Sequence, residues 1–215
     1  MTQATWDRLS EDWSKTVQEP GENVVEFAGS FKQKRKGIVL DVGCGTGRHL
    51  VFLQKSGFSC VGFDISLTAL RKSKEWLTKE GLPPLLVQAD MQFFPFKDRA
   101  YDAEIAVKVI QHGVWVQVEK ALAEISRSIK RGGFILLISP SNEDKIRETG
   151  KEIEPNTFIG IDRPDGEIPH HFLTEDEIKE AFNEFTFHKF DHQIGESRFD
   201  PGKPNSDWIV VGEKV

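Results

Sequence analysis

Short apolar runs recur through the middle of the chain, and segments with helical spacing or turn residues separate them. The runs occupy residues 38–42, 59–64, 85–88, 103–109 and 134–138. Nearly continuous apolar runs of this length are typical of strands buried on both faces of a parallel sheet. Their alternation with helical segments predicts an α/β protein built on a doubly wound sheet.

The two ends of the chain have different patterns. Residues 1–36 predict two helices, the first from an apolar stripe at Trp6, Leu9, Trp13 and Val17. Residues 140–172 contain four prolines and little periodicity, and so predict a long irregular connection. A helix then begins at the capping box that runs from Thr174 to Glu177. Strands are expected over residues 185–194 and 208–212.

A glycine turn follows the first apolar run. Gly43, Gly45 and Gly47 alternate directly after the strand, and a helix is expected from Arg48 to its end near Gly57. Alternating glycines allow a tight turn and let the backbone lie against a ligand. The segment therefore predicts the strand–turn–helix unit of a nucleotide-binding site.

Asp41 changes which nucleotide this turn would accept. An acid two residues before the first glycine repels phosphates at the helix N-terminus and favours a cationic group such as a sulfonium or an ammonium. The third glycine also falls at Gly47, whereas the dinucleotide spacing requires it at position 48, which is Arg48. The simpler alternative is that Asp41 only accepts hydrogen bonds from turn amides.

A second acid ends the next run. Asp64 stands 23 residues after Asp41, close to the spacing of about 20 residues at which an acidic strand end meets a ribose. A carboxylate has two oxygens that can accept from both vicinal hydroxyls. The alternative, that Asp64 caps the following helix, is weakened because Ser66 is the better N-cap residue.

The sequence Asp41-Val42-Gly43-Cys44-Gly45-Thr46-Gly47 resembles motif I of the class I S-adenosylmethionine-dependent methyltransferases. The resemblance extends over residues 36–139 and is to the small-molecule methyltransferases of the ubiquinone-biosynthesis and tellurite-resistance type. It implies a Rossmann-like, seven-stranded, mostly parallel sheet with an antiparallel C-terminal strand and extra N-terminal helices. It also implies S-adenosylmethionine as the cofactor and S-adenosylhomocysteine as the product.

The resemblance further implies which residues bind the cofactor. Asp41 and the turn would hold its amino-acid tail, Asp64 its ribose, and Asp90 and Met91 its adenine. The expected cofactor-binding residues are Asp41, Gly43, Cys44, Gly45, Thr46, Gly47, Asp64, Ile65, Ser66, Asp90, Met91 and Val107. The N-terminal helices would either pack as part of the core or form a lid over the cofactor.

No catalytic residue can be assigned from the pattern. The candidates are His112, His170 and His171, of which the first is either a packed residue, a cofactor contact or a base. The adjacent pair is either a general base near the acceptor or a structural pair before the helix at Thr174. Because no third ligand stands at a suggestive spacing from this pair, no metal site is expected.

Length and composition support a single globular domain over residues 1–215. Within it we expect a helical lid at 1–36, a cofactor-binding core at 37–139, and a substrate loop and strand pair at 140–215. The net charge of −6 argues against a nucleic-acid partner. Two cysteines without disulfide or metal spacing fit a cytoplasmic protein. No apolar run approaches membrane-spanning length. A small-molecule substrate and a monomer or homodimer are expected.

Two alternative functions remain open at this point. One is a methyltransferase that acts on protein or tRNA, and the other is a non-catalytic S-adenosylmethionine-binding regulatory subunit. A nicotinamide-dependent reductase is disfavoured by Asp41 and Arg48, for the reasons given above.

Overall fold

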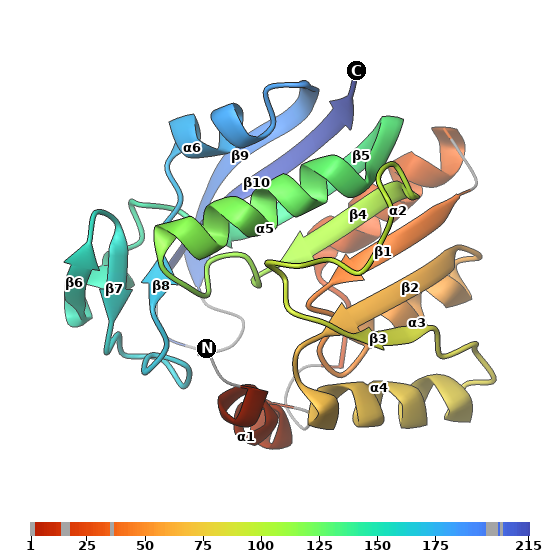
Figure 1. Cartoon of the computed structure of the whole chain (residues 1–215), viewed down its shortest axis with the longest axis horizontal. Helices are drawn as coiled ribbons and strands as arrows, with labels where there is room; N and C mark the ends of the chain where they lie inside the picture. Colours follow the sequence, from red (N-terminus) through yellow and green to blue (C-terminus); the bar gives the residue numbers. More distant parts are fainter. Residues whose placement is uncertain (1–2, 14–17, 35–36, 197–201, 203) are drawn as a thin grey trace.

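The computed structural model describes residues 3–13, 18–34, 37–196, 202 and 204–215. Its main sheet has seven strands in the order β3-β2-β1-β4-β5-β10-β9, and helices lie on both faces (Figure 1). The first five strands run parallel, whereas β10 is antiparallel to both β5 and β9. The predicted fold class, including the antiparallel C-terminal strands, is therefore confirmed.

The elements of the main sheet and its helices follow the chain in order. The strands are β1 (Ile38–Val42), β2 (Ser59–Asp64), β3 (Leu86–Gln88), β4 (Tyr101–Val107), β5 (Ile129–Pro140), β9 (Phe185–Glu196) and β10 (Pro204–Lys214). The helices are α1 (Gln3–Trp13), α2 (Glu22–Lys34), α3 (Arg48–Lys55), α4 (Leu67–Lys79), α5 (Trp115–Ser128) and α6 (Glu175–Ala181). Val17, which the sequence assigned to the first apolar stripe, lies outside the described residues.

Two apolar layers sandwich the sheet because successive side chains of a strand point to opposite faces. Leu40 and Val42 of β1 belong to the layer that α5 and α6 cover. Val39 of the same strand belongs to the layer formed with α2, α3 and α4. The nearly continuous apolar character of the central strands thus follows from burial on both faces.

The connection over residues 140–172 is not the irregular loop that the sequence predicted. It contains a 3₁₀ helix, η1 (Lys145–Thr149), and the small antiparallel sheet β6-β7-β8, built from Lys151–Glu154, Thr157–Ile159 and His170–His171. This sheet is short and rich in polar residues, so its strands lack the apolar alternation by which strands are recognised.

Two backbone hydrogen bonds attach this small sheet to the loop after β4. The Gly113 amide donates to the Pro169 carbonyl at 2.8 Å, and the His171 amide donates to the Gln111 carbonyl at 2.8 Å. In Figure 1, β8 accordingly lies beside the loop between β4 and α5. The last third of the chain is thereby brought to the carboxyl ends of the parallel strands.

The boundary between α5 and β5 also differs from the prediction. The sequence predicted a strand over residues 134–138, but α5 ends at Ser128 and β5 already begins at Ile129, so that the basic residues and glycines over 130–133 belong to the strand. The pairing of β4 with β5 shifts between Tyr101, opposite Ile129, and Ala103, opposite Phe134. The extra residues bulge out of the ladder, with Gly132 at a φ of 68°.

None of the helices in the described parts of the chain combines the length and the apolar character needed to cross a bilayer.

Packing around β2 gives a first prediction. A Cβ on Gly62 would lie 2.5 Å from Leu50 Cδ1 and 2.9 Å from Cys44 Sγ, so Gly62→Ala should overpack the core and lower the free energy of unfolding by about 1–3 kcal/mol. The matched control is Gly29→Ala in α2, where a Cβ meets nothing within 4 Å. The control should stabilise the protein by roughly 0.5–1 kcal/mol because alanine favours a helix interior. Urea unfolding measures both, and equal effects would contradict the packing explanation.

Candidate functional site

A cavity lies at the carboxyl ends of the parallel strands, where open α/β sheets bind their ligands. Its wall combines the glycine turn, the strand ends, α1 and the loop after β4. The lining residues are Trp6, Ser10, Gly43, Cys44, Gly45, Thr46, Arg48, His49, Phe63, Asp64, Ile65, Ala89, Asp90, Met91, Val107, Lys108, Val109 and His112. Most of the expected cofactor-binding residues lie in this one wall, whereas Asp41, Gly47 and Ser66 stand behind it.

The glycine turn brings backbone directly to the cavity. Gly43 has a φ of 63°, and a Cβ there would lie 2.2 Å from Val109 Cγ2. Gly47 has a φ of 90°, precedes α3 as its N-cap, and would clash with Ser73 Oγ at 2.3 Å if it carried a Cβ. Both positions therefore require glycine on conformational and on steric grounds.

Asp64 ends β2 at the edge of the cavity. Its Oδ2 accepts from the Gly45 amide at 2.9 Å, and its Oδ1 accepts from the Ser66 amide at 2.8 Å. Burial raises the pKa of this carboxyl, and the hydrogen bonds from Ser66 and Gly45 act in the opposite direction. Each carboxylate oxygen accepts one protein hydrogen bond here and retains capacity for another donor.

Asp41 lies on β1 behind the wall, with its side chain buried. Its Oδ2 accepts no hydrogen bond from the described residues. Burial raises the pKa of Asp41 to about 8, with Arg48 lowering it and Asp64 raising it further. The buried carboxyl is therefore neutral over much of the range in which an exposed one is charged.

The segment after β3 contributes Asp90 and Met91 to the wall. Asp90 Oδ1 accepts from the Gln92 amide at 2.8 Å, an arrangement typical of an Asx turn. Its second oxygen has only a long contact of 3.4 Å with Gln92 Nε2. Val107, at the end of β4, completes this side of the cavity.

Helix α1 closes the cavity with Trp6 and Ser10. Asp7 fastens the helix to the start of α4, because its Oδ1 accepts from the Thr68 amide at 2.9 Å and from Ser66 Oγ at 2.7 Å. The Thr68 hydrogen bond is the main cause of a lowered pKa at Asp7. On the other side, Arg8 pairs with Glu167 of the 140–172 segment.

Of the three candidate histidines, only His112 lines the cavity. Its Nδ1 lies 2.9 Å from the Val109 carbonyl, and its Nε2 lies 3.2 Å from Asp165 Oδ2. Its ring and that of Trp6 form a T-shaped pair with their centroids 4.6 Å apart. Burial lowers the pKa of His112, and the neighbouring Asp165 carboxylate acts in the opposite direction. Asp165 comes from the connection over residues 140–172, 53 positions after His112, so the sequence gave no sign of this contact.

His171 has a structural environment. Its Nδ1 lies 2.8 Å from Thr157 Oγ1, and its Nε2 lies 3.3 Å from Glu177 Oε2, the acid of the capping box of α6. It is buried and stands outside the cavity wall. His170 also lies outside the wall, with its Nε2 turned toward Asp165 at 3.4 Å.

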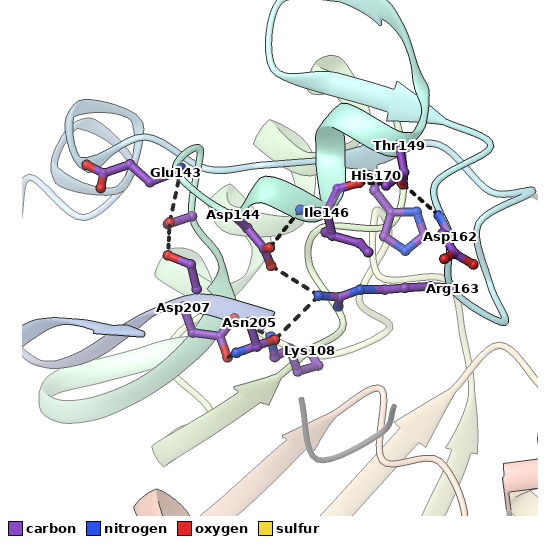
Figure 2. Close-up of polar contacts among 12 residues, drawn as sticks. Lys108, Glu143, Asp144, Ile146, Thr149, Asp162, Arg163, His170, Asn205 and Asp207 are labelled. Carbon is purple, nitrogen blue, oxygen red and sulfur yellow. Dashed lines mark hydrogen bonds and ion pairs between the residues drawn. The ribbon is translucent and has the colours of Figure 1, made fainter. Parts of the chain in front are cut away.

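Lys108 joins the cavity to a buried polar network (Figure 2). Its ammonium pairs with Asp207 and donates to Asn205 Oδ1 at 3.0 Å. Arg163 reaches the same Asn205 oxygen and pairs with Asp144 at 3.1 Å. Burial lowers the pKa of Lys108, whereas Asp207 raises it. The spacing of these residues in the sequence gave no sign of this network.

The buried Asp41 generates a prediction about stability. Between about pH 4 and pH 8, Asp41 is ionised in the unfolded chain and protonated in the native protein. The free energy of unfolding should therefore fall as pH rises through this window. Asp41→Asn imitates the neutral carboxyl and should remove this fall, with a gain on the order of a few kcal/mol at pH 8. Urea unfolding at several pH values measures it. Asp191→Asn, on an exposed part of β9, is the control, and an unchanged pH slope in Asp41→Asn would contradict the prediction.

Comparison with known proteins shows what the chain is similar to. Residues 39–133 match the methyltransferase domain family. Over 113 residues the chain is 30% identical to a phosphatidylethanolamine N-methyltransferase of Cereibacter sphaeroides. The matched region covers 52% of this chain and 54% of that protein. The chain spans about half the length of the curated relatives that it matches.

Solved structures show the same fold. A SAM-dependent methyltransferase of Methanosarcina mazei superposes with a TM-score of 0.70 at 21% identity, over 84% of this chain and 93% of that one. TehB of Haemophilus influenzae superposes with a TM-score of 0.72 at 18% identity, over 98% of this chain and 67% of that one. The chain therefore has the fold of these class I S-adenosylmethionine-dependent methyltransferases, and residues 39–133 are similar in sequence to the methyltransferase domain family.

Proposed function

We propose that the protein transfers a methyl group from S-adenosylmethionine to a small-molecule acceptor. The observation that carries this proposal is the cavity itself, in which the glycine turn, Asp64 and Asp90 line one continuous wall. The acceptor is proposed to enter on the side of α1 and the 140–172 segment, opposite the sheet.

The wall contains the polar groups that the cofactor requires. Asp64 retains lone pairs for the two ribose hydroxyls, in addition to its bonds from Gly45 and Ser66. Asp90 has an oxygen available to accept from the adenine amino group, and the Met91 amide would serve a ring nitrogen. The turn at Gly43 and Gly45 would lie against the amino-acid tail.

Asp41 enters this proposal indirectly. Because it stands behind the wall within electrostatic range of Arg48 and Asp64, we infer that it tunes the charge around the turn. A cationic tail bound at the turn would favour the ionised form of this carboxyl. The proposed role thus differs from the direct contact that the sequence suggested.

Methyl transfer from a sulfonium is an in-line displacement in which the acceptor atom forms a bond to the methyl carbon as the carbon–sulfur bond breaks. The cofactor supplies the leaving group, so the protein contributes mainly alignment and a dry site. The Val109 carbonyl holds Nδ1 of His112 at 2.9 Å, and Nε2 is directed at Asp165 Oδ2, 3.2 Å away. We therefore propose that His112 forms part of the wall and is not the general base.

Helix α1 is proposed to act as a lid. Trp6 and Ser10 face the cavity, while Asp7 and Arg8 hold the helix to α4 and to the 140–172 segment on either side. These polar attachments can open without disrupting the apolar layers of the sheet. An opening of this kind would let the cofactor in and the product out.

Calorimetry tests the cofactor. The protein should bind S-adenosylhomocysteine and should not bind NADH. Asp64→Ala should weaken S-adenosylhomocysteine binding by ~1–3 kcal/mol, because the ribose hydroxyls lose their acceptor. Asp191→Ala, exposed on β9, is the matched control and should bind like the wild type. Binding of NADH alone, or unchanged affinity in Asp64→Ala, would overturn the assignment.

The acceptor class needs a separate experiment. Incubation of the protein with methyl-labelled S-adenosylmethionine and fractionated cell extract should transfer label to the low-molecular-weight fraction. Label that appears only in the protein or tRNA fraction would replace the small-molecule proposal. Binding of S-adenosylhomocysteine without transfer to any fraction would indicate a regulatory subunit instead.

A further inference from the structure

Beside the cavity, three metal-ligating side chains from distant parts of the sequence converge. The ligand atoms of His112, Asp165 and His170 all lie within 4.8 Å of one another, and all three residues are buried. We propose that they form a binding site for a divalent transition-metal ion. The proposal does not depend on methyl transfer, because the cluster exists whatever the cavity binds.

The hydrogen bonds of the two rings show which nitrogen is free to ligate. His112 Nδ1 lies 2.9 Å from the Val109 carbonyl, and His170 Nδ1 lies 2.8 Å from the Ile168 carbonyl. A carbonyl oxygen can only accept, so each Nδ1 must carry the proton. In the neutral rings, each Nε2 therefore presents a lone pair. A histidine held by its Nδ1–H on a backbone carbonyl is the usual arrangement of a metal ligand.

Both lone pairs face the same carboxylate oxygen. Asp165 Oδ2 lies 3.2 Å from Nε2 of His112 and 3.4 Å from Nε2 of His170. Three acceptors that converge in a buried place repel one another unless a positive charge lies between them.

Gln111 adds an independent observation. Its Nε2 lies 3.3 Å from His112 Nε2, and its Oε1 is buried without a partner among the described residues. Turning the amide over would direct this oxygen at the cluster, where it could contact a bound ion or the water on that ion. An orphaned buried oxygen next to two lone pairs and a carboxylate indicates that a cation is needed there.

Donor chemistry selects the class of ion. Two imidazole nitrogens and one carboxylate are the ligands of catalytic zinc sites and of facial iron(II) sites, both of which leave positions open. Zinc bonds of about 2.0–2.2 Å separate two tetrahedral ligands by about 3.4 Å, so small rotations of the two rings complete the site. Magnesium prefers oxygen ligands and should not compete.

The site is placed to affect the acceptor if the proposed function is correct. His112 belongs both to the cluster and to the cavity wall, between Trp6 and Asp165. An ion at its Nε2 would carry open positions close to the side from which the acceptor is proposed to enter. A divalent ion there would lower the pKa of a coordinated hydroxyl or thiol, which releases its proton to solvent.

Titration of the chelator-treated full chain with Zn²⁺ tests the site by calorimetry. One equivalent should bind with a Kd in the micromolar range or tighter, and excess Mg²⁺ should leave the isotherm unchanged. Co²⁺ should give visible ligand-field bands that Zn²⁺ abolishes. Absence of bound Zn²⁺ together with absence of the Co²⁺ bands in the wild type would overturn the proposal, and would favour a proton shared within the cluster.

Variants locate the ion. Asp165→Asn keeps the shape of the side chain, and His170→Gln removes one nitrogen ligand; each should weaken Zn²⁺ binding at least tenfold. His171→Gln and His188→Gln are the controls, the first in the buried histidine pair but outside the cluster, the second on the exposed face of β9. The controls should bind Zn²⁺ like the wild type. Undiminished binding in both cluster variants would overturn the site.

Folding and function are followed separately. Thermal melting and S-adenosylhomocysteine calorimetry on each variant show whether the chain has folded and whether the proposed cofactor still binds. Loss of Zn²⁺ binding with S-adenosylhomocysteine binding retained supports the metal site specifically. Failure to bind S-adenosylhomocysteine in a wild type that binds Zn²⁺ would remove the proposed function and leave the metal site intact.

Discussion

The wall of the cavity depends on the hydrogen bonds that the Asp64 carboxylate accepts. Through its two oxygens it holds the glycine turn at Gly45 and the start of α4 at Ser66. Gly43 and Gly47 of the turn have no side chains to fix it, because a Cβ at either position would clash with Val109 or Ser73. A buried acceptor shared between two loops thus supplies the rigidity that a side-chain core supplies elsewhere.

The same point fastens the N-terminal helix. Ser66 caps α4 by accepting from the Ala69 amide at 3.0 Å, and its hydroxyl donates to Asp7 of α1. Asp64, Ser66 and Asp7 therefore form a chain of polar contacts from the turn to the helix over the cavity. Since these contacts share one serine, we infer that the position of α1 and the geometry of the proposed ribose site are coupled.

The part of the cavity proposed to bind the cofactor was predictable because its signals are local. Each buried strand could be recognised from its apolar run, and a parallel sheet brings the carboxyl ends of such strands together. Asp64, Asp90 and the glycines therefore had to meet once the strands were identified. The N-cap at Ser66 and the capping box at Thr174 were equally local, and the structure contains both.

The side of the cavity from which the acceptor is proposed to enter was not predictable in this way. The histidine–carboxylate cluster joins residues separated by more than fifty positions, and no spacing rule links them. They meet because the loop after β4 pairs with β8, through a backbone bridge between His112 and His170. Pairing of this kind depends on the tertiary fold. The expectation that the histidine pair would lack further metal ligands considered only distances along the sequence.

Ion pairs with largely buried side chains join the last third of the chain to the sheet. Lys108 has a φ of 55° directly after β4, and its ammonium pairs with Asp207 of β10. Arg163 and Asp144 form a second buried pair that meets it at Asn205. Loss of one partner in such a pair leaves an uncompensated buried charge and typically costs about 3–5 kcal/mol. The last third of the chain is thus joined to the cavity wall by contacts that involve neither Asp64 nor the glycine turn, so we infer that changes to its exposed loops leave that part of the site undisturbed.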